Sequence, residues 1–140
     1  MTAITIEYFQ VVQNREETTL TVKSGESVSS RRGKFMRVDA TTAKAMLGNA
    51  SSTTEYANLH GIALADQKYV GDSVTLFRDG LLDWGNALDS MDYGAPIYVS
   101  DTDGTFADSA GTVTTAIAGY VFPVFENDGT VKKLADIKLR

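Results

Sequence analysis

The stretch Tyr93-Gly-Ala-Pro-Ile-Tyr-Val-Ser-Asp-Thr-Asp-Gly-Thr-Phe-Ala-Asp108 combines a strand, a turn and the start of a returning strand. Residues 95–99 are rich in β-branched and aromatic side chains, and Gly94 and Pro96 fix the backbone where this strand begins. Residues 100–104 have turn chemistry, because Asp can bond its own backbone and Gly adopts positive φ at little cost. The stretch therefore predicts a tight hairpin.

Short strands separated by Gly and Asp turns continue on both sides of this hairpin. The predicted strands are residues 61–65, 73–77, 112–118, 119–125 and 134–139. The predicted turns are Gly71-Asp72, Arg78-Asp79-Gly80 and Asp128-Gly129. Regular short strands with frequent turns favour a mainly β fold, a small antiparallel β-barrel or sandwich.

One short helix is expected in this mainly β chain, over residues 41–47. Asp39 can accept hydrogen bonds from the free N–H groups of a first helical turn. Ala43 and its neighbours are good helix formers, and Gly48 suits the left-handed position that ends a helix.

The first thirty residues differ from the rest of the chain. Two short alternating runs, around Ile6 and around Leu20, are followed by a linker rich in Ser, Gly and charge. They are either edge strands of the main sheet or an extended arm that pairs with a neighbouring molecule. We therefore divide the chain into residues 1–30, arm or edge strands, and residues 31–140, the β body.

The composition excludes several classes of protein. Lys and Arg number 13 against 18 Asp and Glu, which gives a net charge of −5, and Cys is absent. A nucleic-acid-binding protein usually presents a basic face, so no nucleic-acid partner is expected. The N-terminus lacks the features of a signal peptide, and no stretch approaches the roughly 20 apolar residues of a membrane helix. We expect no membrane partner, and a protein made and kept inside a cell or released by lysis.

The sequence contains no recognisable catalytic or metal-binding apparatus. His60 is the single histidine, and no serine lies in a nucleophile-elbow motif. The run that starts at Asp101 resembles a calcium loop, but its twelfth position is Thr112 where such a loop needs a bidentate Glu. We therefore expect no enzyme activity, no metal and no cofactor.

Aromatic residues gather in the second half of the chain. They form either the apolar core or a stripe that binds carbohydrate, and strand spacing favours the core. The carbohydrate alternative, a carbohydrate- or surface-binding β module, predicts that Trp84 and Tyr93 are exposed in a row. The aromatic set is Tyr93, Tyr98, Phe106, Tyr120, Phe122 and Phe125.

Three segments in order resemble the capsid cement, or head decoration, proteins of tailed bacteriophages. They are Gly61-Ile-Ala-Leu-Ala-Asp66 with Val70-Gly-Asp-Ser-Val-Thr-Leu76, then Tyr93 to Asp108, then Ala118-Gly-Tyr-Val121. The resemblance covers residues 61–121. It implies a β-tulip-like form of the fold and a structural, non-enzymatic role. In this context the carbohydrate- or surface-binding alternative is a β module of a phage tail or fibre.

The resemblance also implies where such a protein acts. It would be a virion protein on the outer capsid surface, made in the host cytoplasm, that bridges copies of the major capsid protein as a homotrimer. An extended terminal arm often makes the bridging contact in this family. The residues we expect to bind the partner are Ile4, Ile6, Tyr8, Phe9, Arg31 and Arg32.

Overall fold

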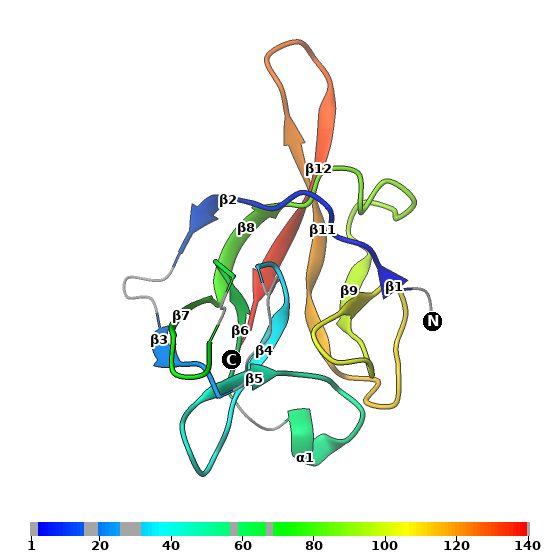
Figure 1. Cartoon of the computed structure of the whole chain (residues 1–140). Helices are drawn as coiled ribbons and strands as arrows, with labels where there is room; N and C mark the ends of the chain where they lie inside the picture. The colour runs from blue at the N-terminus through cyan, green and yellow to red at the C-terminus, as the bar shows by residue number, and fades with distance from the viewer. Residues whose placement is uncertain (1–2, 16–19, 26–31, 57–58, 67–68, 140) are drawn as a thin grey trace.

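The fold is mainly β, as the turn-rich sequence predicted. The structure is a computed structural model that describes residues 3–15, 20–25, 32–56, 59–66 and 69–139. Within these ranges two antiparallel sheets pack in a sandwich-like arrangement that is not a closed barrel (Figure 1). In the same ranges no helix is long and apolar enough to cross a membrane.

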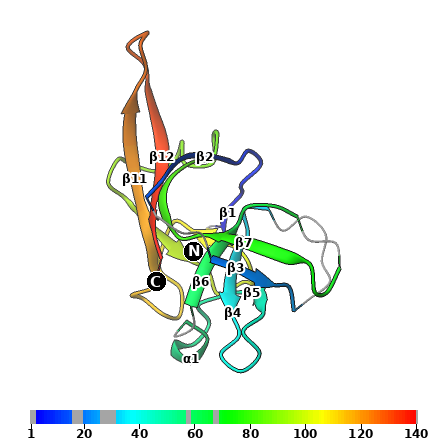
Figure 2. The ribbon, with the colours of Figure 1, turned by 90° about the vertical axis from the view of Figure 1, so that its left-hand side faces the viewer.

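The larger sheet has seven strands. Their order across the sheet is β1 (Ala3–Ile4), β10 (Phe106–Ala107), β9 (Pro96–Val99), β11 (Ile117–Phe125), β12 (Val131–Lys138), β8 (Asp79–Asp83) and β2 (Gln10–Asn14). Strands β11 and β12 form a long hairpin whose end extends beyond the rest of the molecule in both views (Figures 1 and 2).

The smaller sheet has five strands. Their order is β3 (Leu20–Lys23), β7 (Ser73–Phe77), β6 (Leu59–Ala63), β4 (Phe35–Val38) and β5 (Ala45–Leu47). A parallel bridge between Ser24 and Ala45 brings the chain just after β3 against β5. The sheet therefore curls until its two edges meet at one point.

The main core lies between the two sheets and is rich in aromatic rings. Phe35 from the smaller sheet meets Phe106 from the larger one edge to face, with 5.7 Å between ring centroids. The ring of Trp84 lies 5.2 Å from that of Phe106, and all three side chains are buried. A second, smaller apolar cluster fills the curl of the five-stranded sheet: Met36, Ala45, Ala63, Val74 and Leu76.

The hairpin predicted from residues 93–108 is confirmed. Strands β9 and β10 pair with Val99 opposite Phe106, and residues 101–104 form the turn. The carboxylate of Asp101 accepts hydrogen bonds from the backbone N and Oγ1 of Thr112, at 3.0 and 2.5 Å. In the described ranges no group of three His, Cys, Asp or Glu side chains could hold a metal ion.

The predicted helix over residues 41–47 is wrong. Asp39 does accept from the backbone N–H groups of Thr41 and Thr42, at 2.8 and 2.9 Å. However, the backbone N of Asp39 donates to the carbonyl of Lys44, which closes a hairpin between β4 and β5. The hydrogen bonds of Asp39 that would cap a helix therefore belong to a turn. The helix in the described residues is α1 (Thr53–Tyr56), which lies beyond the predicted one.

Two further predictions need correction. Residues 78–80 were expected to form a tight turn, but Asp79 and Gly80 begin β8, and the chain crosses at Arg78 from β7 in one sheet to β8 in the other. The strand predicted from residue 112 begins at Ile117 instead, because the preceding residues form bends and a turn.

The N-terminal segment supplies both edges of the seven-stranded sheet. Strand β1 pairs with β10, with Ile4 opposite Phe106, and β2 pairs with β8 at the other edge. The chain between them crosses from one edge of the sheet to the other (Figure 1). We call residues 5–9 the strap.

Candidate interaction surface

The strap has an inner side and an outer side. Ile6 and Phe9 are half-buried and pack against the main core, whereas Thr5, Glu7 and Tyr8 are exposed. The expected alternation of Ile4, Ile6 and Tyr8 therefore fails after Ile6. Phe9 takes the next inward position, and the ring of Tyr8 is turned to the surface.

Arg32 holds the strap from the side of the smaller sheet. Its Nη2 atom donates to the backbone carbonyl of Phe9 at 2.7 Å, and its guanidinium lies over the ring of Phe9, 5.4 Å from the centroid. The backbone N of Arg32 also donates to Asp66, at 3.0 Å. A guanidinium can bond a carbonyl and cover an aromatic face together, so one residue fixes both parts of Phe9.

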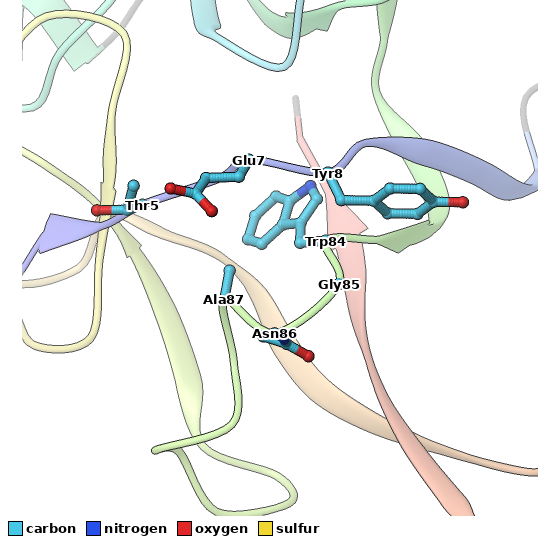
Figure 3. A pocket seen from close by; sticks show the side chains of 7 residues that line it. All are labelled: Thr5, Glu7, Tyr8, Trp84, Gly85, Asn86 and Ala87. Atoms are coloured by element: carbon cyan, nitrogen blue, oxygen red, sulfur yellow. The ribbon is translucent and has the colours of Figure 1, made fainter.

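A groove of about 570 Å³ lies between the strap and the turn that follows β8. Trp84 lies on its floor, between the strap and the turn (Figure 3). The ring of Tyr8 points away from the groove in this view, toward its hydrogen bond with Gln10. The groove is lined by Thr5, Glu7, Tyr8, Trp84, Gly85, Asn86 and Ala87.

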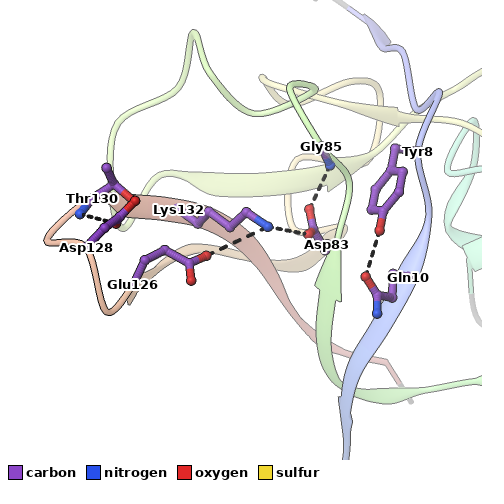
Figure 4. Close-up of polar contacts among 8 residues, drawn as sticks. All are labelled: Tyr8, Gln10, Asp83, Gly85, Glu126, Asp128, Thr130 and Lys132. Atoms are coloured by element: carbon purple, nitrogen blue, oxygen red, sulfur yellow. Dashed lines mark hydrogen bonds and ion pairs between the residues drawn. The ribbon is translucent and has the colours of Figure 1, made fainter.

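A polar network joins this turn to the β11–β12 hairpin (Figure 4). Asp83 accepts from the backbone N of Gly85 at 2.8 Å and from Nζ of Lys132 at 3.1 Å. Nζ of Lys132 also lies 3.8 Å from a carboxylate oxygen of Glu126. The hydrogen bond and charge of Asp83 raise the pKa of Lys132, with a smaller contribution from Glu126. Lys132 thus stays charged and is held within its own chain.

Arg15 fastens the far end of β2. Its Nε donates to Asp79 at 2.7 Å, and its Nη2 donates to Asp136 at 2.5 Å and to the carbonyl of Ile137 at 3.3 Å. Hydrogen bonds to Asp136 and then to Asp79 raise the pKa of Arg15 above its usual value. The guanidinium therefore links the end of β2 to β8 and, beyond it, to β12, a role that the charge pattern alone did not indicate.

The structure brings most of the predicted partner-binding residues to the strap region, in different environments. Ile4 is buried at 8% exposure, opposite Phe106 in the sheet. Ile6 and Phe9 are half-buried, and Tyr8 and Arg32 are exposed. Arg31 lies outside the described residues. Only the exposed members can reach a partner while the strap stays in place.

The expectation that the aromatic set forms the core is wrong for most of its members. Phe106 is fully buried, but Phe125 is 76% exposed, Tyr120 50% and Tyr93 49%. Phe122 is also exposed, and Tyr98 is half-buried. Alternation with the buried Val121 could have shown this for Tyr120 and Phe122, but not for Phe125, which lies on the same alternating face as Val121. The exposed rings lie in the seven-stranded sheet and the loop beside it.

The carbohydrate-binding alternative required Trp84 and Tyr93 to lie exposed in one row. Trp84 is only 1% exposed and packs against Phe106 in the core, so this part of the prediction is wrong. Tyr93 is exposed as expected, but Nζ of Lys133 lies over its ring, 5.1 Å from the centroid.

Comparison with known proteins gives one result. No curated protein and no solved structure matches the chain at a significant level. The sequence model of the phage structural cement proteins, described as "Structural cement protein (E217 gp24/Pam3 gp6)", matches residues 9–140. The match covers every described strand except β1, and it includes only Phe9 of the strap. This chain belongs to the phage structural cement protein family.

Proposed function

We propose that this protein binds the outer surface of an icosahedral phage capsid and stabilises contacts between copies of the major capsid protein. The observation that carries the proposal is the family match over residues 9–140, which makes the chain a structural virion component. The sandwich supports this role, because a packed β body holds its surface loops in fixed positions. A cement protein needs such fixed contacts and no chemistry.

The strap region supports a contact with the shell. Tyr8 is exposed and lines the groove, and Arg32 is exposed and holds Phe9 of the strap. Tyrosine and arginine are enriched at the energetically important positions of protein interfaces. We propose that the strap and the rim of its groove form the surface that meets the major capsid protein.

A homotrimer on the shell fits the same role. Each copy then contributes its own shell contact, and three linked contacts hold far more tightly than one because the second and third become intramolecular. The net charge of −5 also favours a shell surface of opposite sign, since complementary charges speed encounter and fix orientation.

The stabilising role can be tested on capsids directly. Expanded capsids of the phage that encodes this chain, stripped of it, are heated with and without the purified protein. We expect added protein to raise the temperature at which capsids release DNA, with saturation at a fixed copy number. An unchanged release temperature at saturating protein would contradict the proposal, and serum albumin at the same concentration is the control.

A further inference from the structure

The β11–β12 hairpin, residues 117–138, has a projecting end with few neighbours in its own chain. Strand β9 pairs with β11 only as far as Tyr120, and β8 pairs with β12 only from Ala135 onward. Beyond those points Phe122 to Leu134 have only each other as paired strand neighbours among the described residues. An isolated two-stranded hairpin is marginally stable in water, so a partner that packs on this end would stabilise it.

The projecting end carries apolar side chains on both faces. Phe122 lies opposite Leu134, and Phe125 lies opposite Val131. Successive residues of a strand point to opposite faces, so Phe122 and Phe125 are on different faces. Phe125 is 76% exposed, Phe122 41% and Val131 38%. The projecting end therefore exposes apolar side chains on both of its faces.

The charge of the hairpin differs from that of the rest of the chain. Residues 117–138 hold three acidic and three basic side chains, so the hairpin is neutral and the net charge of −5 lies elsewhere. The basic residues Lys132 and Lys133 are engaged by Asp83 and by the carbonyl of Met91. Two identical acidic molecules repel each other, so they associate best through a neutral apolar surface.

Rotational symmetry explains why both faces are apolar. In a three-fold ring each copy meets one neighbour with one surface and the other neighbour with a different surface. An element beside the axis therefore needs a contact on each side. We propose that the β11–β12 hairpin is the contact between copies of this chain, with Phe122 and Phe125 packing against two neighbouring copies.

The inference rests on the proposed trimeric cement function, and its test does not need capsids. Sedimentation velocity measures the association of the full-length protein, the Phe125→Ser and Phe122→Ser variants, and a Tyr69→Ser control. Tyr69 is 61% exposed and lies in the β6–β7 connection of the other sheet. Circular dichroism melts verify that each variant is folded.

We expect the wild type to form trimers, and each hairpin variant to raise the dissociation constant at least ~30-fold, as for a buried aromatic hot spot. Tyr69→Ser should behave as the wild type. Raising NaCl from about 0.05 M to about 0.5 M should strengthen association, because salt screens the repulsion between acidic copies.

Three results would overturn the inference. The first is a wild type that stays monomeric at about 200 μM, far above the micromolar range of ordinary specific association. The second is that the folded hairpin variants associate as the wild type does. The third is that the Tyr69→Ser control dissociates as much as the hairpin variants. Capsid binding separates this from the proposed function. A monomeric wild type that still saturates capsids removes only the hairpin contact, whereas a trimer that never binds capsids removes only the cement role.

Discussion

Gly119 and Asp136 lie so close across the β11–β12 pair that a β-carbon on Gly119 would be 2.0 Å from the carbonyl oxygen of Asp136. The side chain of Asp136 also accepts a hydrogen bond from Arg15. The register of β11 against β9 shifts between Ile117 and Gly119. The base of the projecting hairpin is therefore a close backbone contact that only glycine permits.

Replacing Gly119 with Ala should lower the free energy of unfolding by about 3 kcal/mol or more, because backbone atoms of β11 and β12 would have to separate. Gly129→Ala in the same hairpin is the control. Gly129 has φ of 88° and no atom within 4 Å of an added β-carbon, so only its backbone strain of ~1–2 kcal/mol is expected. Urea unfolding measures both. Equal losses in the two variants would contradict the close-contact explanation.

Arg15→Ala should lower the free energy of unfolding by about 1 kcal/mol, since the guanidinium is partly exposed and water screens its ion pairs. The loss should shrink in high salt. Arg15→Lys is the control, because a lysine keeps the charge but can bond only as a point donor and not as a fork. Chemical denaturation at low and high NaCl measures the effect. A loss that is independent of salt would mean that packing of the side chain, and not its pairing with Asp79 and Asp136, stabilises β2.

The β4–β5 turn predicts an acid-sensitive stability. Backbone hydrogen bonds from Thr42 and Thr41 lower the pKa of Asp39 below its ordinary value of 3.8. A carboxylate with a lowered folded pKa adds stability above its unfolded value and loses it as the pH falls through the folded value. The protonation of this group should therefore lower the melting temperature as the pH drops below 3.8. The Asp39→Asn variant should melt at a lower temperature than the wild type at neutral pH, and its melting temperature should decrease less in acid. Parallel curves of melting temperature against pH for the two proteins would contradict this role of Asp39.

Tyr8→Ala should weaken capsid binding roughly ten-fold and leave the melting temperature nearly unchanged, because half of the side chain is exposed. Tyr69→Ala is the matched control, an exposed tyrosine in the β6–β7 connection of the other sheet. Co-sedimentation isotherms with capsids give the affinities. If the two variants bind equally well, the strap is not the shell-binding surface.

Trp84 provides an intrinsic reporter that separates the cement role from carbohydrate binding. It is the single tryptophan and is 1% exposed, so its emission should be blue-shifted in the folded protein and move to the red on unfolding. Glycans should leave the emission unchanged. A spectral shift at constant melting temperature on adding a glycan would support the carbohydrate alternative.

The sequence was informative where local chemistry and long-range pairing agree. The Gly94–Pro96 opening and the Asp-Gly turn of residues 100–104 specify their hairpin without help from distant segments, and the structure contains it. The family resemblance rested largely on the same stretch, and the family match confirms it.

The sequence was misleading where one local signal serves two structures. Asp39 accepts from Thr41 and Thr42 as a helix cap would, but the same bonds close a turn, and pairing of β5 with β4 decides the outcome. Arg78 lies between two strands whose sheets cannot be assigned from local pattern. The exposure of Phe125 depends on how far the hairpin projects past its neighbouring strands, which is set by distant pairings.

Co-sedimentation with expanded, undecorated capsids of the phage that encodes this chain tests the cement role most directly. Purified protein is titrated against a fixed amount of capsid, and the pelleted fraction is quantified. We predict saturable binding with a copy number that is a multiple of three per capsid face. The account would be contradicted if the protein stays in the supernatant at every ratio. The positive control is that the same capsids bind cement protein released from native, decorated particles.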